Sequence, residues 1–206
     1  MPDATKKTKP VLALFDFDGT LTTRDSFVDF HIFSQGPTKF LSACAVAAIQ
    51  GCRSLNGSRG FLKEALVRRL WGGTPLEDYE AAARRYAELR VEEILLPLAL
   101  RVFLRHVELG HIVYIVTASM KEWIEPWASI HGVPVIGTEL ETLDGKLTGR
   151  LATPNCRGAE KVVRITGVTD LKRYEKIYAY GNSRGDREML DIADEKIYRW
   201  DHVPEI

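Results

Sequence analysis

The sequence predicts an α/β protein in which a mostly parallel sheet is covered by helices on both faces. Short apolar runs typical of buried strands, at 11–15, 112–116 and 176–180, alternate with segments of helical pattern. Between the first two runs lies a block of helical patterns without strand alternation, at about 25–92. The expected architecture is therefore a Rossmann-like three-layer α/β sandwich that carries an inserted helical cap.

A chain of 206 residues is long enough for one domain with an insertion. We expect residues 1–24 and 93–206 to form the core and residues 25–92 to form the cap. Within the cap, Gly-rich and Pro-containing breaks separate the expected helices, which cover about 25–34, 38–49, 59–70 and 76–91.

The remainder of the core alternates helices and strands after Pro97. The expected elements are helix 98–109, strand 112–116, helix 121–131, strand 133–136, hairpin 138–151, helix 158–165, strand 176–180, helix 185–193 and strand 196–200. Pro126 should bend its helix or mark the true start. The hairpin is expected around Asp144-Gly145, because Asp-Gly between alternating apolar residues favours a tight turn.

Composition limits the partners. Lysine and arginine together number 28, as do aspartate and glutamate, so no overall field favours nucleic acid, and a small-molecule partner is expected. Cys44, Cys52 and Cys156 are widely spaced and match no metal-ligand pattern, which suits a reducing compartment. The sequence leaves the oligomeric state open.

Two apolar runs bear on targeting and membrane insertion. The run 11–15 is too brief for a signal-peptide core, so we expect a cytoplasmic protein. The run 40–52 falls short of the ~20 residues that span a bilayer. Contact of this cap segment with a membrane surface stays open as an alternative, and a packed helix is favoured.

Two carboxylates follow the first strand. Asp16 and Asp18 are two residues apart, so on an extended backbone their side chains point the same way and could share a metal ion or a phosphoryl group. Gly19 then allows the chain to turn away. Taken alone, the segment also fits a hairpin, since Asp18-Gly19 is flanked by apolar residues.

Similar polar groups occur at the ends of later strands. They are Thr117 and Ser119 after the second strand and Asn182, Ser183 and Asp186 after the fourth, with Lys161 on the helix between. Each alone has an ordinary explanation as a helix cap, a turn or a solvated lysine. Because ligands bind at the carboxyl ends of parallel strands, their order along the chain predicts one common site.

These segments resemble a known family. Asp16-Phe17-Asp18-Gly19-Thr20, then Thr117, Lys161 and the segment 181–186 look like the four motifs of the haloacid dehalogenase superfamily of phosphohydrolases. The helical insert and the segment 155–162 resemble the branch, subfamily IB, that holds phosphoserine phosphatase and phosphatidylglycerophosphatase C.

The resemblance implies a role for each motif residue. Asp16 would be the nucleophile that forms an aspartyl phosphate, and Asp18 the general acid and base, with a higher pKa than Asp16. Lys161 and a metal would keep Asp16 ionised. Phosphoryl oxygens would accept hydrogen bonds from Thr117 and the backbone around Ala118, with Ser119 as the alternative donor. The substrate-binding group is completed by Gly19, Thr20 and Asp25.

The resemblance also implies a Mg²⁺ cofactor. Its ligands would be the Asp16 carboxylate, the Asp18 backbone carbonyl, Asn182 and Asp186, a set of oxygen donors that Mg²⁺ prefers. The chain departs from the family pattern at Asn182, where an acidic residue is usual. We therefore expect weaker metal binding without loss of activity.

The cap should select the substrate. In phosphoserine-type relatives an acidic residue after the first motif and a cap arginine bind the amino acid. Asp25 has the corresponding place, although it also fits a helix cap, and Arg53, Arg59 and Arg68 are candidates for the arginine. The cap is also rich in apolar residues, which suits an amphiphilic substrate or simply a packed cap core.

The expected function is a magnesium-dependent phosphomonoesterase that acts on a small or amphiphilic phosphorylated metabolite, either phosphoserine-like or phospholipid-head-group-like. Two alternatives remain. Asn182 motivates a catalytically weak phosphate-binding or regulatory module, and interception of the aspartyl phosphate by another acceptor would make the protein a phosphotransferase.

Overall fold

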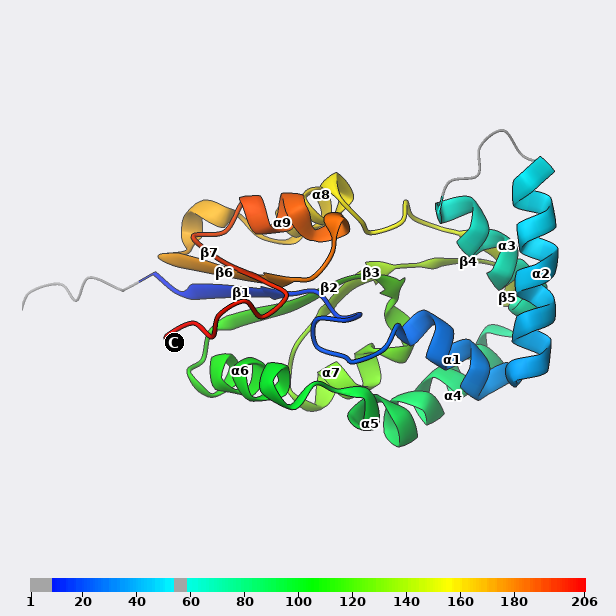
Figure 1. Ribbon diagram of the computed structural model, residues 1–206, viewed down its shortest axis with the longest axis horizontal. Helices are drawn as coiled ribbons and strands as arrows, with labels where there is room; N and C mark the ends of the chain where they lie inside the picture. The colour runs from blue at the N-terminus through cyan, green and yellow to red at the C-terminus, as the bar shows by residue number, and fades with distance from the viewer. Residues whose placement is uncertain (1–8, 54–58) are drawn as a thin grey trace, which may run out of the picture.

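Five parallel strands form the central sheet of the computed structural model, which describes residues 9–53 and 59–206 (Figure 1). In spatial order they are β3 (Val135–Thr138), β2 (Ile112–Met120), β1 (Val11–Phe15), β6 (Lys176–Gly181) and β7 (Glu195–Tyr198). All four neighbouring pairs are parallel. The predicted α/β fold class is therefore confirmed.

Strand β1 occupies the centre of the sheet. Leu12, Ala13, Leu14 and Phe15 are completely buried, because helices cover both faces of the strand. This explains why the strand is apolar at every position rather than at alternate ones. Asp16 directly follows it, and its backbone N–H donates to the Tyr180 carbonyl at 2.9 Å.

Helices cover the two faces of the sheet (Figure 1). On one face lie α6 (Pro97–Glu108) and α7 (Glu125–Ile130), and on the other lie α8 (Ala159–Val168) and α9 (Arg187–Asp191). On the first face Phe103 meets Phe15 edge to face, with 5.5 Å between ring centroids. On the second, Leu12 and Leu14 belong to a buried cluster with Ile165.

The helical segment inserted after β1 lies beyond the carboxyl ends of the strands (Figure 1). It consists of α1 (Ser26–Gln35), α2 (Pro37–Arg53), α3 (Arg59–Trp71), α4 (Leu76–Tyr86), a π-helical turn η1 (Ala87–Val91) and α5 (Glu92–Ile94). Phe30 of α1 is completely buried; its ring stacks on Trp71 at 5.7 Å and on Trp123 at 4.4 Å. Since Trp123 belongs to the segment after β2, this aromatic cluster joins the cap to the core.

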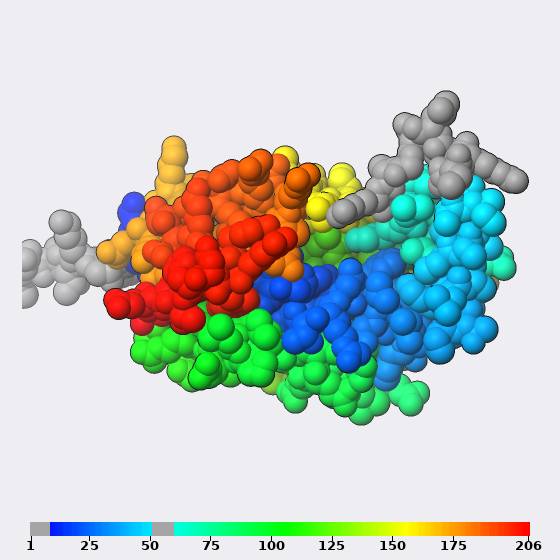
Figure 2. Space-filling view, in the orientation of Figure 1, coloured from blue at the N-terminus to red at the C-terminus, as the bar shows by residue number. Residues whose placement is uncertain are grey.

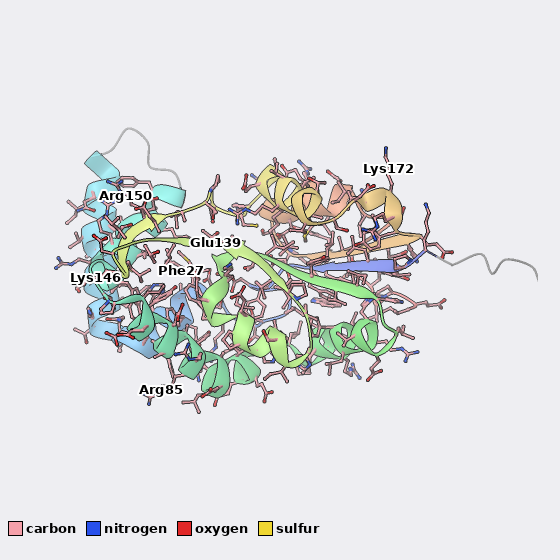
Figure 3. The ribbon with its side chains drawn as sticks, turned by 180° about the vertical axis from the view of Figure 1, so that it is seen from behind. Phe27, Arg85, Glu139, Lys146, Arg150 and Lys172 are labelled. Atoms are coloured by element: carbon pink, nitrogen blue, oxygen red, sulfur yellow. The ribbon has the colours of Figure 1, made fainter. Side chains whose placement is uncertain are left out.

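The predicted hairpin forms and packs against the cap. Its strands are β4 (Leu140–Leu143) and β5 (Lys146–Leu151), and Asp144 and Gly145 both have positive φ at the turn. Leu147 exchanges backbone hydrogen bonds with Gly73 and Thr74. Lys146 and Arg150 are consequently found at the cap end of the molecule, whereas Glu139 marks the base of the hairpin (Figure 3). The boundary of the cap at 25–92 stays a prediction. The hydrogen bonds of Leu147 show that the hairpin, although outside this range, contacts the cap directly.

Several predicted boundaries differ from the structure; for example, α8 continues to Val168 and β3 begins at Val135. Strand β2 continues to Met120, so Thr117, Ala118 and Ser119 lie within its last part and not after it; the pairing register with β3 shifts between Val116 and Met120. The predicted helix 121–131 is divided into a 3-10 turn, η2 (Lys121–Trp123), and α7. The last strand ends at Tyr198 because the next two residues turn with positive φ.

The last residues of the chain, red in Figure 2, lie beside the green residues of α6. Within residues 9–53 and 59–206, none of the helices is long and apolar enough to cross a membrane.

Candidate active site

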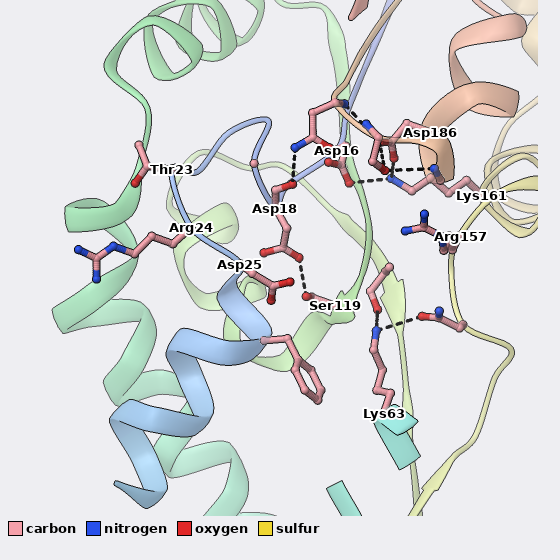
Figure 4. A pocket seen from close by; sticks show the side chains of 17 residues that line it. Asp16, Asp18, Thr23, Arg24, Asp25, Lys63, Ser119, Arg157, Lys161 and Asp186 are labelled. Carbon is pink, nitrogen blue, oxygen red and sulfur yellow. Dashed lines mark hydrogen bonds and ion pairs between the residues drawn. The ribbon is translucent and has the colours of Figure 1, made fainter. Parts of the chain in front are cut away.

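A cavity of about 460 Å³ opens at the carboxyl edge of the sheet, where the core meets the cap (Figure 4). Most of the residues predicted for the site line it, although they come from distant parts of the chain. They are Asp16, Asp18, Gly19, Asp25, Ala118, Ser119, Lys161, Asn182 and Asp186. The structure thus brings together the four sequence motifs.

Lys161 lies between two carboxylates at the base of the cavity. It projects from α8, and its Nζ is 2.7 Å from Asp16 Oδ1 and 2.6 Å from Asp186 Oδ1. Its third close contact is the Val116 carbonyl at 2.7 Å. The side chain is 1% exposed, so these three acceptors replace water around the ammonium. Lys161 therefore fixes the relative positions of the first and fourth motifs.

The two carboxylates respond differently to this environment. Burial raises the pKa of Asp16 to about 6, and the opposing effect of Lys161 only limits the rise. Burial also acts on Asp186, but Lys161 and the hydrogen bonds from Ser183 outweigh it and lower the pKa of that group. The expectation that Lys161 and a metal together keep Asp16 ionised stays a prediction, because Lys161 by itself does not offset the effect of burial on this pKa.

Asp186 is also a structural anchor of its own loop. Its Oδ2 accepts hydrogen bonds from the backbone N–H of Ser183 at 2.9 Å and from the Ser183 hydroxyl at 2.8 Å. These two residues form a capping box at η4 (Arg184–Asp186). A short loop is thereby held rigidly beside the cavity.

Asp18 is positioned by two donors. The Ser119 hydroxyl donates to Oδ2 at 2.5 Å, and the backbone N–H of Ser26, at the start of α1, donates to Oδ1 at 2.7 Å. Burial and the neighbouring charge of Asp25 raise the pKa of Asp18. A carboxyl group that is oriented and easily protonated suits proton transfer.

The other predicted residues have varied positions. Thr20 is buried and its hydroxyl donates to Asp16 Oδ2 at 2.8 Å. Gly19 has φ +75°, a conformation that favours glycine, and a Cβ there would come within 2.1 Å of the Asn182 amide nitrogen and displace it. Thr117 is completely buried, and its Oγ1 accepts from the Ser119 N–H at 3.0 Å. Ser119, the alternative donor, lines the cavity.

The helix-cap interpretation of Asp25 is confirmed: its side chain accepts the N–H of Val28 at 3.2 Å at the start of α1. Asp25 also lines the cavity, so this role does not remove it from the site. Of the candidate cap arginines, Arg68 lies against Gly149 of the hairpin, while Arg53 and Arg59 fall outside the described side chains.

The oxygen donors around Asp16 fit a magnesium ion. Carboxylates of Asp16 and Asp186, the carbonyl of Asp18 and the amide oxygen of Asn182 are hard donors of the kind Mg²⁺ uses together with water. In the structure the Asn182 amide nitrogen donates to the Asp18 carbonyl at 3.1 Å. Asn182 would therefore have to turn its amide group to offer oxygen to a metal on that carbonyl. Over the described residues, no three His, Cys, Asp or Glu side chains cluster closely enough to hold a metal ion by themselves, so backbone and amide oxygens would have to complete this set of ligands.

Sequence reasoning missed a cation of the cap. Lys63 of α3 reaches across the cavity, where its Nζ donates to the Ala118 carbonyl at 2.6 Å and to Asn155 Oδ1 at 3.0 Å. Burial lowers its pKa to about 8. A signal existed, because positions 63, 67, 70 and 71 share one face of α3 and the last three are buried apolar residues. A lysine on a buried stripe is unusual enough to mark a specific partner.

Arg157, from the loop before α8, is another cation that lines the cavity and that was not among the predicted site residues. Its guanidinium lies so close to Gly185 that a Cβ there would approach Cζ to 2.7 Å. The segment 155–162 contained this residue, but its type alone did not indicate whether the side chain faced the site.

This arrangement of fold and motifs agrees with the comparison with known families. The family model of haloacid dehalogenase-like hydrolases matches residues 13–191, and the chain belongs to this family. The match runs from within β1 to the end of α9, includes all four motifs and leaves only strand β7 of the sheet outside.

Individual relatives agree with this assignment. Protein CicA of Caulobacter vibrioides is 38% identical over 195 residues, covering 93% of this chain and 86% of that protein. A protein of unknown function from Bordetella pertussis Tohama I has the same fold, with a TM-score of 0.78 and 24% identity over 93% of this chain and 90% of that one. A phosphoserine phosphatase solved as a phospho-aspartyl intermediate analogue is similar at a TM-score of 0.54 and 22% identity, covering 93% and 87% of the two chains.

Proposed function

We propose that this hydrolase is a magnesium-dependent phosphomonoesterase that works through an aspartyl phosphate on Asp16. The observation that carries the proposal is the pair of carboxylates at the end of β1, one ion-paired with buried Lys161 and the other held by Ser119 and Ser26. Family membership and the fold shared with a phosphoserine phosphatase support it.

In the first half of the reaction, a carboxylate oxygen of Asp16 attacks phosphorus as the bond from phosphorus to the leaving oxygen breaks. Asp18 gives its proton to that oxygen, which its raised pKa makes easier. In the second half, Asp18 takes a proton from water, the water oxygen attacks phosphorus, and the bond to Asp16 breaks. Inorganic phosphate leaves and both carboxyl groups return to their starting state.

Other residues orient the reacting groups. Thr20 and Lys161 each bind one oxygen of Asp16, which restricts rotation of the nucleophile. Mg²⁺, held by Asp16, the Asp18 carbonyl, Asn182 and Asp186, would neutralise charge on the phosphoryl group. At pH values above about 6, the nucleophile is mostly ionised even without the metal.

The charges around the cavity support an anionic substrate of modest size. Four acidic residues, Asp16, Asp18, Asp25 and Asp186, are matched by four basic ones, Arg24, Lys63, Arg157 and Lys161. A divalent cation would be balanced by the two charges of a phosphomonoester. Phe27, on the cap side of the cavity, offers an apolar surface to the leaving group of the substrate. We therefore propose a phosphoserine-like or phospholipid-head-group-like phosphomonoester as the substrate.

Hydrolysis of p-nitrophenyl phosphate with and without Mg²⁺ tests the proposal. Wild-type protein should turn over only with the metal, and Asp16→Asn should lower kcat by at least a thousandfold. Asp144→Asn, at the exposed tip of the hairpin, is the matched control and should keep wild-type activity. Turnover that survives Asp16→Asn, or that ignores the metal, would refute the mechanism.

One competing function is a phosphate-binding module with little turnover. It is motivated by Asn182, which is neutral where an acidic residue would add a negative charge near the proposed metal. That function predicts that phosphate binds without measurable hydrolysis. A phosphotransferase would instead give new phosphomonoesters when alcohols compete with water. Screening phosphorylated amino acids and lysophospholipids would then identify the substrate.

A further inference from the structure

Lys63 belongs to the cap, yet its closest contact is a backbone oxygen of the core. The Ala118 carbonyl accepts a hydrogen bond from Lys63 Nζ at 2.6 Å (Figure 4). It accepts another from Thr138 Oγ1, at the end of β3, at 2.7 Å. Bonds from a charged donor are among the stronger ones in proteins. Two separate elements therefore hold one carbonyl group in the last part of β2.

The same donors are tied to the loop before α8. Lys63 also donates to Asn155 Oδ1 at 3.0 Å, and the Cys156 N–H donates to Thr138 Oγ1 at 3.1 Å. Thr138 is completely buried and its hydroxyl group thus acts as both donor and acceptor. Lys63 is consequently one member of a network that joins α3, β2, β3 and this loop.

The peptide group between Ala118 and Ser119 is central to the site. Its carbonyl points at Lys63 and Thr138, and its N–H donates to Thr117 Oγ1 at 3.0 Å. Ser119 in turn holds the Asp18 carboxylate. Any rotation of this peptide would break these contacts together and could turn a carbonyl oxygen, with its partial negative charge, toward the phosphoryl group.

We propose that Lys63 is a positioning residue that, with Thr138, holds the Ala118 carbonyl away from the phosphoryl group and thereby keeps Thr117 and Ser119 in place. The inference rests on the proposed phosphatase function and extends it by giving the cap a part in the chemical step. Lys63 acts through the backbone of the core, so its effect does not require contact with the leaving group.

Substitution of each donor tests this proposal. Lys63→Met and Thr138→Val should each lower kcat for p-nitrophenyl phosphate about tenfold, with KM changed less than threefold. Thr138→Val alters no charge, so its loss cannot come from a weaker field in the cavity. Thr138→Ser keeps the hydroxyl and should restore kcat, and Lys39→Met, on the exposed surface of α2, should leave it unchanged.

Vanadate binding provides a measurement that does not depend on turnover, because vanadate adopts the five-coordinate geometry of phosphoryl transfer. Calorimetry with Mg²⁺ present should give about tenfold weaker affinity for Lys63→Met and Thr138→Val and wild-type affinity for the two controls. Thermal unfolding of each variant identifies any loss that comes from unfolded protein.

Two results would overturn the inference. One is a Thr138→Val variant with wild-type kcat and vanadate affinity. The other is a Lys63→Met variant that is normal on the aryl phosphate and defective only on substrates with a second anionic group, which would make Lys63 a direct substrate contact. If instead the wild type hydrolyses no phosphomonoester, but vanadate binds about tenfold more weakly to Lys63→Met and Thr138→Val than to the wild type, the proposed function fails and the positioning role stands.

Discussion

Replacing Lys161 by methionine would leave two buried carboxylates without their shared cation. In the wild type its Nζ lies 2.7 Å from Asp16 and 2.6 Å from Asp186, and the exposed fractions of the three side chains are 1%, 9% and 2%. Removing one partner of a buried ion pair typically costs about 3–5 kcal/mol, because an uncompensated charge remains in a poorly hydrated site. We expect Lys161→Met to lower the free energy of unfolding by this amount at pH 8.

The loss should depend on pH in a definite direction. Without the ammonium, the pKa values of Asp16 and Asp186 rise in the folded variant above their values in the unfolded chain. A raised folded-state pKa means that the folded state gains stability relative to the unfolded state as pH falls. The difference between variant and wild type should therefore shrink between pH 8 and pH 5.

Urea denaturation at the two pH values measures this difference. Lys196→Met provides the matched control, since Lys196 is half exposed and pairs with Asp191 at 3.2 Å on the surface. Such pairs contribute about 1 kcal/mol or less. A Lys161→Met loss below about 1 kcal/mol, or one of equal size at pH 8 and pH 5, would refute the assignment of Lys161 as the buried counter-ion.

Three further predictions concern other parts of the molecule. Asn182→Asp adds a carboxylate to the proposed Mg²⁺ ligands. The attraction between this charge and a cation 4 Å away is about 1–4 kcal/mol before salt screening, so calorimetry should show at least fivefold tighter Mg²⁺ binding. Burial lowers the pKa of His106 to about 3, so the unfolded state binds the proton first and stability should fall as pH drops below about 6.5. The loss of unfolding free energy due to His106 is about 3 kcal/mol at pH 4.5. Between pH 6.5 and pH 4.5 the urea midpoint of a His106→Asn variant should therefore change less than that of the wild type. Gly149→Val should lower Tm by several degrees, because its φ is +81° and a Cβ would come within 2.4 Å of the Arg68 Cα, whereas Gly167→Ala, where a Cβ meets nothing within 4 Å, should not.

The sheet and the first-motif residues could be predicted because their signals are local. An uninterrupted apolar run such as 11–15 indicates a strand buried on both faces, and Asp16 and Asp18 follow where such a strand ends. Because parallel strands have their carboxyl ends at one edge of the sheet, motifs far apart in the sequence could be predicted to lie close together. The structure agrees, since Lys161 contacts both Asp16 and Asp186.

The features that the sequence did not predict depend on contacts between residues far apart along the chain. The end of β2 depends on pairing with β3, which continues past a register shift to Met120 and keeps Thr117 inside the strand. Lys63 belongs to no sequence motif, and its proposed role depends on a hydrogen bond to the carbonyl of Ala118, a residue far away in the sequence. The docking of the hairpin likewise depends on how Gly149 fits against Arg68.

The central place of β1 in the sheet has a consequence for synthesis of the chain. The two sheet partners of Leu12 are Ile112 and Ile177, which leave the ribosome about 100 and 165 residues after it. Contacts between residues so distant along the chain require closure of long loops, which slows folding. Asp16, the proposed nucleophile next to β1, thus reaches its place in the site only after the chain as far as β6 has emerged, and nascent chains that end before β6 lack this arrangement.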